Sequence, residues 1–100
     1  MRRYGRIDAN QNEIVKKLRD AHHSVWITSS VGNGTPDLVI GRNGISLPCE
    51  LKVGKAQLTD DELDWHTEWK GSVAIVHSFE EAVEAMNEQI RRLHGKAAKT

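Results

Sequence analysis

The chain has 100 residues, 38% of them hydrophobic and 28% charged, and its 14 basic residues balance its 14 acidic ones. This length predicts one domain with one core, and no apolar run approaches the ~20 residues that a membrane span needs. The single cysteine, Cys49, excludes an internal disulfide and favours a reducing compartment such as the cytoplasm, so we expect it to be a small buried apolar residue.

The first eight residues predict a basic arm that precedes the first helix. Its arginines are Arg2, Arg3 and Arg6. Apolar residues at helical spacing then predict a helix over residues 9–23, capped by Asp8 or Asn10. If the basic residues at the two ends of the chain converge, they form a surface for phosphate groups. Otherwise they are solvated helix faces and frayed ends.

Three strands are expected next, over residues 25–28, 37–40 and 45–53. The pair Asn43-Gly44 favours a tight hairpin turn between the second and the third. In the third strand apolar and other residues alternate, which predicts two different faces. The core face would carry Ile45, Leu47, Cys49, Leu51 and Val53. The opposite face would carry Glu50 and, two residues later, Lys52.

The second half of the chain predicts a helix, a strand and a helix. Thr59 and Glu62 form a capping-box pattern that begins the first helix, and Gly71 ends it. Residues 73–76 read as a short buried strand parallel to the strand at 45–53. Ser78 and Glu81 repeat the capping pattern, and residues 95–100 read as a loose tail. The fold class is therefore a single α/β domain over 1–100, of order α-β-β-β-α-β-α, with a mixed sheet flanked by helices.

Two acids and a lysine are the residues from which we infer the chemistry of the protein. Hairpin pairing would bring Asp37 alongside Glu50, and two carboxylates with the backbone carbonyl of Leu51 suit Mg²⁺ or Mn²⁺. Lys52 would leave the strand on the same face as Glu50, where its ammonium could orient a water or stabilise charge on a phosphate. Taken singly, these residues could also be a same-face strand pair and a turn cap.

The run Gly34-Thr35-Pro36-Asp37-Leu38, followed by Glu50-Leu51-Lys52, by 55–58 and by a helix with Trp65-His66, resembles the virus-type replication-repair nuclease domain. That domain belongs to the PD-(D/E)xK nuclease superfamily, together with archaeal Holliday junction resolvases. The resemblance extends from about Glu13 to about Met86. It implies that Asp37 and Glu50 are metal ligands and that Lys52 is the catalytic lysine.

The same resemblance implies further roles. Glu13 matches an acid near the metal, although it could instead form a capping box with Asn10. Ser30 matches a loop serine near the scissile phosphate, or is simply a polar loop residue. Lys55, in the loop after the third strand, is a candidate for DNA binding, as are the arginines of the arm.

One position departs from the family pattern. Many members have a glutamine where this chain has Glu62, which also fits the capping box with Thr59. Gln57 lies nearby and could compensate. The fourth catalytic position is therefore left open between these two residues.

The expected function is metal-dependent cleavage of DNA. The resemblance to junction resolvases implies a homodimer, because two symmetric cuts need two sites. It also implies a phage or prophage product acting in the bacterial cytoplasm. Residues Trp65 and Trp69, or the apolar stripe of the last helix, could form the dimer interface. Alternatives are a nicking or flap nuclease without junction preference, and a DNA-binding or partner-binding module with an inactive site.

Overall fold

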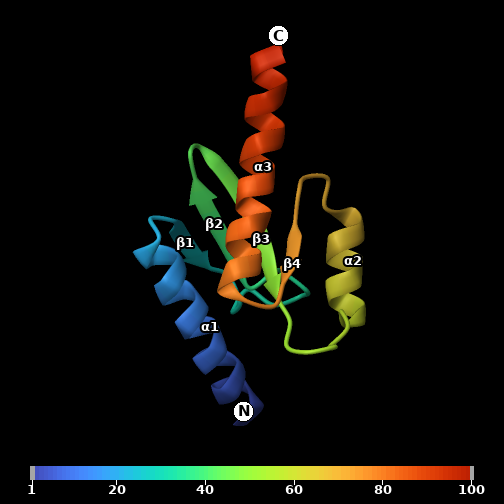
Figure 1. Ribbon diagram of the computed structural model, residues 1–100. Coiled ribbons are helices and arrows are strands. Elements are labelled where there is room, and N and C mark those ends of the chain that lie inside the picture. Colours follow the sequence, from blue (N-terminus) through green and yellow to red (C-terminus); the bar gives the residue numbers. More distant parts are fainter. Residues whose placement is uncertain (1, 100) are drawn as a thin grey trace.

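A computed structural model describes the backbone of residues 2–99 and the side chains of residues 10–94. The elements follow the order predicted from the sequence (Figure 1). They are α1 (Arg2–Asp20), β1 (Ser24–Ile27), β2 (Leu38–Arg42), β3 (Ile45–Leu51), α2 (Asp60–Glu68), β4 (Ala74–Val76) and α3 (Phe79–Lys99). The predicted order and the mixed α/β class are confirmed.

The four strands form one sheet in the order β1-β2-β3-β4. The first three are antiparallel neighbours, and β4 lies parallel to β3 across α2, as predicted. Asn43 and Gly44 turn the β2–β3 hairpin with φ of 55° and 79°. Two consecutive positive φ values are what a tight hairpin turn requires, and Asn-Gly adopts them at low cost. This turn fixes the register in which Leu38 lies opposite Cys49.

The core lies between one face of the sheet and the helices α1 and α3. Leu38, Ile40, Leu47, Cys49 and Val76 alternate along β2, β3 and β4 and are all buried. They pack with apolar residues of the two helices in one cluster, which comprises Ile14, Val15, Leu18, Ala82 and Met86. Cys49 is thus a buried core residue, as expected. Val53 was predicted to share this face but is exposed, because β3 ends at Leu51.

Both end helices are longer than the sequence predicted. α1 begins at Arg2, so residues of the expected arm are helical and Asn10 is inside the helix instead of capping it. α3 continues to Lys99 through the segment expected to be a tail. The reason is composition, since neither segment contains proline and an interior glycine costs only about 1 kcal/mol relative to alanine. The side chains of Arg2, Arg3 and Arg6 lie outside the described residues.

The two ends of the chain do not converge. α1 begins at one end of the molecule and α3 finishes at the opposite end (Figure 1). The arrangement of residues 2–99 therefore contains no phosphate-binding surface built from both basic ends.

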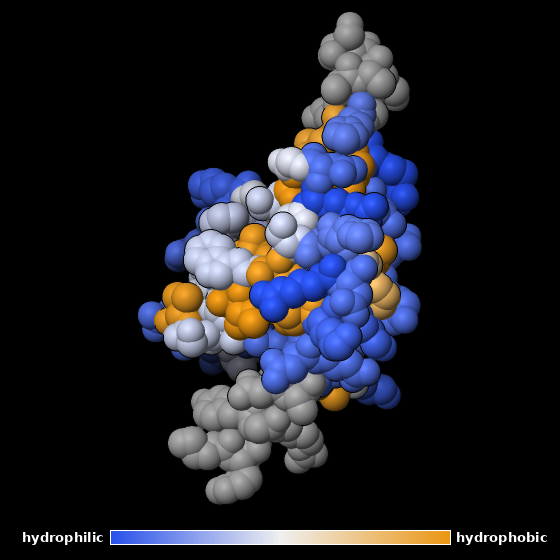
Figure 2. Space-filling view, turned by 90° about the vertical axis from the view of Figure 1, so that its left-hand side faces the viewer, coloured by the Kyte–Doolittle hydropathy of each residue, from blue (hydrophilic) through white to orange (hydrophobic). Residues whose placement is uncertain are grey.

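Figure 2 faces the side of α1 and β1, where apolar side chains are exposed among hydrophilic ones. Trp26, Ile27 and Val31 are exposed hydrophobic residues of β1 and the loop that follows it.

α2 differs from the other helices because none of its residues is buried. It stands beside β4 (Figure 1) and carries the predicted capping box, in which Thr59 and Glu62 bond reciprocally. Trp65 and Trp69 stack on each other with ring centroids 4.8 Å apart, and neither lies in the core. The second predicted box is only half formed. Ser78 accepts from the N–H of Glu81, but the Glu81 carboxylate accepts from the N–H of His77.

Candidate active site

Asp37 is held at the entrance of β2 by the loop that connects β1 and β2. The N–H of Thr28 donates to the Asp37 carbonyl over 2.8 Å, and the Thr28 hydroxyl donates to the Pro36 carbonyl over 2.7 Å. These two bonds close the base of the loop. The Asp37 carboxylate then accepts a hydrogen bond from the N–H of Leu51 over 2.8 Å. The carboxylate of Asp37 is therefore fixed against β3, as the hairpin register predicted.

Glu50 is a buried acid on the face of β3 opposite the core. Only 3% of it is exposed, and its Oε1 atom has no hydrogen-bond partner. Burial, followed by the nearby carboxylates of Asp37 and Glu62, raises the pKa of Glu50 to about 9. A buried acid without a compensating partner is costly. The site is therefore arranged around a buried carboxyl group whose cationic neighbour, the Lys52 ammonium, lies 4.0 Å from its Oε2 atom.

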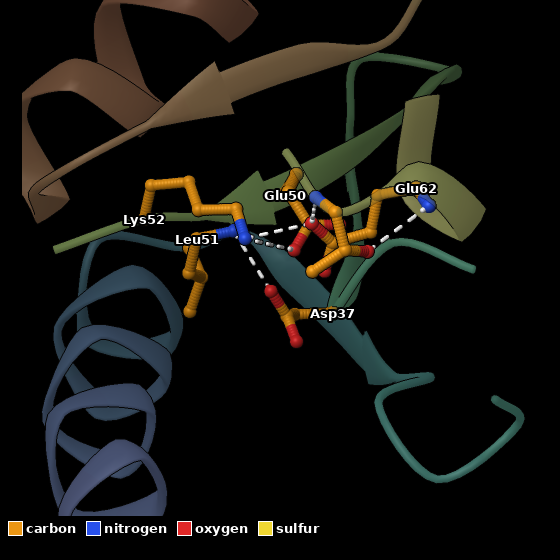
Figure 3. Close-up of polar contacts among 6 residues, drawn as sticks. Asp37, Glu50, Leu51, Lys52 and Glu62 are labelled. Atoms are coloured by element: carbon orange, nitrogen blue, oxygen red, sulfur yellow. Dashed lines mark hydrogen bonds and ion pairs between the residues drawn. The ribbon is translucent and has the colours of Figure 1, made fainter. Parts of the chain in front are cut away.

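Lys52 completes the cluster, together with Glu62 from the first turn of α2 (Figure 3). Its ammonium lies 2.7 Å from Glu62 Oε1 and 4.0 Å from Glu50 Oε2. Burial alone would raise the pKa of the Glu62 carboxyl, but hydrogen bonds from Lys52 and from the Thr59 backbone outweigh it and lower that pKa. The short contact thus pairs Lys52 with Glu62 more closely than with Glu50.

One oxygen of Glu62 serves two partners. Oε1 accepts from the N–H of Thr59 over 2.9 Å and also from the Lys52 ammonium. The sequence left Glu62 open between a capping role and the fourth catalytic position. The structure contains the cap and, in addition, a contact between Glu62 and Lys52. Because the cap fixes the rotamer of Glu62, the beginning of α2 determines where the Lys52 ammonium lies.

The cluster fits a hard divalent cation in its donor types. Asp37 and Glu50 offer carboxylate oxygens, and the unpartnered Glu50 Oε1 is the position that gains most from a cation. The N–H of Leu51 points toward Asp37, and in a strand the carbonyl of a residue points to the same side as its N–H. No group of three or more His, Cys, Asp or Glu side chains suited to a metal occurs among the side chains at 10–94. Backbone and water oxygens would have to complete the coordination.

Among the side chains at 10–94, the remaining predicted residues make no hydrogen bond or ion pair with this cluster. Glu13 is 65% exposed at its side chain and pairs with Lys17 over 3.5 Å, on the part of α1 that lies beside α3. Gln57 and Lys55 are exposed in the loop between β3 and α2, and Ser30 is exposed in the loop after β1. The structure therefore brings together Asp37, Glu50, Leu51, Lys52 and Glu62.

Sequence reasoning missed two residues of α1 near the site. Asn10 lines a cavity of about 170 Å³ together with Leu51 and Lys52. Gln11 is buried, donates to Ser29 Oγ over 3.3 Å and leaves its Oε1 without a partner. A signal for Gln11 was present, because it shares the apolar face of α1 with Ile14 and is the polar residue at a core-facing position.

Comparison with known proteins gives no match. No family model matches the chain, and neither a curated protein nor a solved structure matches it significantly. Within residues 2–99, no helix is long and apolar enough to cross a membrane. The interpretation of the site therefore depends on its own geometry.

Proposed function

We propose that the protein is a metal-dependent DNA endonuclease of the PD-(D/E)xK type. The observation that carries the proposal is the convergence of Asp37, Glu50 and Lys52 on one end of the β2–β3 hairpin, with an unpartnered acid oxygen among them. These residue types, in this order and on this face, suit phosphodiester hydrolysis. The resemblance of the sequence pattern to the virus-type replication-repair nuclease domain supports the same activity.

Asp37 and Glu50 would hold Mg²⁺ or Mn²⁺, with the Leu51 carbonyl on the same side. Such a cation supplies Lewis acidity, which lowers the pKa of a water and offsets charge on a phosphate. Lys52 would orient the attacking water or donate to a phosphate oxygen, which requires its ammonium to face the substrate. Glu62 would hold that ammonium in position, taking the place of the glutamine of the family pattern.

Cutting a four-way junction symmetrically would require two copies of this site. We therefore propose a homodimer that acts on branched DNA in the cytoplasm of a bacterium or a phage-infected cell. The stripe of α3 is mostly covered by the sheet and α1, so the stacked Trp65 and Trp69 are the better candidates for a shared surface. Sedimentation of the purified chain would give its oligomeric state directly.

The decisive experiment is cleavage of a labelled four-way junction and a matched linear duplex, with Mg²⁺, Mn²⁺ or EDTA. We expect paired symmetric cuts that need metal and are lost in Lys52→Ala. Asp37→Asn is a second variant, because the amide oxygen can still accept from Leu51 and preserve the fold. Lys16→Ala is the matched control, since Lys16 pairs with Asp20 on the exposed side of α1.

Other outcomes of this experiment change the proposal. Metal-dependent cutting without junction preference would indicate a nicking or flap nuclease. Equal cutting by native protein and Lys52→Ala, with a normal unfolding transition in both, would remove the catalytic assignment.

A binding module with an inactive site is the second candidate. It is favoured by the close pairing of Lys52 with Glu62 and by the raised pKa of Glu50, which keeps that carboxyl protonated at neutral pH. Titration of the chain with Mn²⁺ in a calorimeter separates the two candidates. Heat that is lost in Asp37→Asn supports the nuclease, and absence of heat supports the module.

A further inference from the structure

Gln11, on α1, is a buried polar residue that neither the apolar core nor the proposed mechanism uses. Only 4% of it is exposed, and its amide nitrogen donates to Ser29 Oγ over 3.3 Å. Its Oε1 atom is buried and has no hydrogen-bond partner among the described residues. A buried acceptor without a donor costs about 1–3 kcal/mol. The position therefore favours a ligand that brings a donor to this oxygen.

The contact with Ser29 places Gln11 on the β1 side of Asp37. Ser29 directly follows Thr28, whose N–H donates to the Asp37 carbonyl over 2.8 Å. Neighbouring strands are about 4.8 Å apart, so the amide group of Gln11 lies roughly one to two strand spacings from the aspartate. That range is too long for a direct hydrogen bond and suits a contact through water.

Asn10, the preceding residue of α1, lies on the β3 side of Asp37. It borders a cavity of about 170 Å³ together with Leu51 and Lys52, and Figure 3 shows α1 beside these two residues. The N–H of Leu51 donates to the Asp37 carboxylate, so the cavity adjoins the proposed metal ligands. It has room for several waters. Because consecutive Cα atoms are only about 3.8 Å apart, this turn of α1 lies across the aspartate from β1 to β3.

A cation held at this end of the sheet would retain water. Asp37, Glu50 and the Leu51 carbonyl offer three protein oxygens, so an octahedral Mg²⁺ would keep about three waters. The charge of a cation polarises each bound water and makes it a strong hydrogen-bond donor. The free Oε1 atom of Gln11 is an acceptor on the α1 side of the site and matches such a donor.

We propose that Gln11 is a positioning residue for the cation of the Asp37–Glu50 site, with its Oε1 atom accepting a hydrogen bond from a metal-bound water. Ser29 holds the amide nitrogen and thereby directs the oxygen. The proposal rests on the proposed nuclease function and assigns α1 a role in it. A neutral acceptor orients the water without adding a further negative charge beside two carboxylates.

Calorimetric titration with Mn²⁺ tests this contact independently of cleavage. Gln11→Met has a side chain of similar size and lacks both amide atoms. We expect it to bind Mn²⁺ about tenfold more weakly than the native chain, the loss typical of an outer-shell partner. Gln89→Met is the matched control, because Gln89 also bonds to a serine, Ser72, but lies on α3 beside the segment that leads into β4. The control should bind Mn²⁺ as the native chain does.

Gln11→Glu keeps the acceptor and adds a charge. Without metal it should unfold at a lower temperature than the native chain, because a buried carboxylate is costly. It should bind Mn²⁺ about tenfold more tightly, because an ionised acceptor strengthens the hydrogen bond to the water. Thermal unfolding with and without Mn²⁺ gives a second measure of affinity, since a ligand that binds only the folded chain raises the transition. A purely structural role predicts the reverse for Gln11→Met, namely a lower transition with unchanged Mn²⁺ affinity.

Each outcome decides the role of Gln11 separately from the nuclease activity. Unchanged Mn²⁺ affinity in Gln11→Met, with metal-dependent cleavage by the native chain, overturns this role and keeps the nuclease. A tenfold loss of affinity without cleavage by the native chain keeps the role and removes catalysis. If Gln11→Met does not fold, an affinity of Gln11→Glu at or below the native value overturns the proposal. Absence of Mn²⁺ binding by the native chain overturns both.

Discussion

The two sides of the sheet differ sharply in how much apolar surface they bury. The side that carries α1 and α3 contains the whole buried apolar cluster, whereas α2 contributes no buried residue. Yet α2 supplies Glu62, the residue that lies closest to the Lys52 ammonium. Buried apolar contact is therefore concentrated on one side of the sheet, and the candidate site is held by caps, ion pairs and a loop contact.

A matched pair of leucines tests this difference most strongly. Leu38 is fully buried in β2, and Leu63 is exposed on α2. We expect Leu38→Ala to lower the free energy of unfolding by about 3–4 kcal/mol, because it leaves a cavity in the core. Leu63→Ala should change it by less than about 0.5 kcal/mol. Urea unfolding measures both, and similar losses would show that α2 is packed more tightly than its exposure indicates.

Two glycines of the loop between β1 and β2 provide the next comparison. Gly32 and Gly34 both have φ near +80°, but only at Gly34 would an added methyl group collide with the backbone carbonyl of Asp61. Gly32→Ala should cost about 1–2 kcal/mol, the penalty of the left-handed conformation alone. Gly34→Ala should cost more than this and should also displace α2. Equal shifts of the thermal transition in the two variants would argue against a close contact between loop and helix.

The raised pKa of Glu50 predicts a pH dependence of stability. The carboxyl titrates near 4.5 when the chain is unfolded and at about 9 in the folded protein. Between these values the folded protein retains a proton that the unfolded chain has released, so stability falls as pH rises. Glu50→Gln remains neutral and should not show this fall. We expect the variant to be more stable than the native chain at pH 8, and to match it below pH 4.5.

Calorimetry or urea unfolding between pH 4.5 and 8 measures the difference in stability between the native chain and Glu50→Gln. The lowered pKa of Glu62 acts in the opposite direction and in a different window, since its contribution is lost as pH falls below about 4.5. A native chain whose stability relative to Glu50→Gln does not change between pH 5 and 8 would show that Glu50 is ionised throughout.

The smallest expected effects on stability come from removing two helix caps of similar geometry. Thr59 accepts from the N–H of Glu62 over 3.2 Å, and Ser78 accepts from the N–H of Glu81 over 3.1 Å. Each change to alanine should cost about 1 kcal/mol. The consequences should differ in hydrogen exchange, because α3 is held by the core and α2 is not. Faster exchange confined to α2 in Thr59→Ala is expected, and the same local loss in α3 of Ser78→Ala would contradict it.

Local signals in the sequence predicted the features that depend on neighbouring residues. Asn43-Gly44 determined the hairpin turn, and the turn determined the pairing that brings Asp37 to β3. Thr59 and Glu62 gave the start of α2 correctly. In each case the deciding interaction spans only a few residues, so no knowledge of the tertiary packing was needed.

Features that depend on distant contacts were not predictable in the same way. The raised pKa of Glu50 results from burial and from the carboxylates of Asp37 and Glu62 beside it, which alternation in β3 alone does not indicate. Glu13 matches an acid of the family pattern, but its side chain is exposed on α1 and pairs with Lys17. The start of α1 was misplaced because a basic, glycine-containing segment resembles an arm when only composition is considered.

Cys49 gives the protein an internal reporter of sheet opening. It is the sole thiol, is fully buried in β3, and has a pKa that burial raises to about 12. A thiol reagent cannot reach it, and the reactive thiolate scarcely forms, until β3 separates from its neighbours. The rate of labelling of the unmodified chain therefore measures the frequency of that separation, one residue away from Glu50, without any engineered probe.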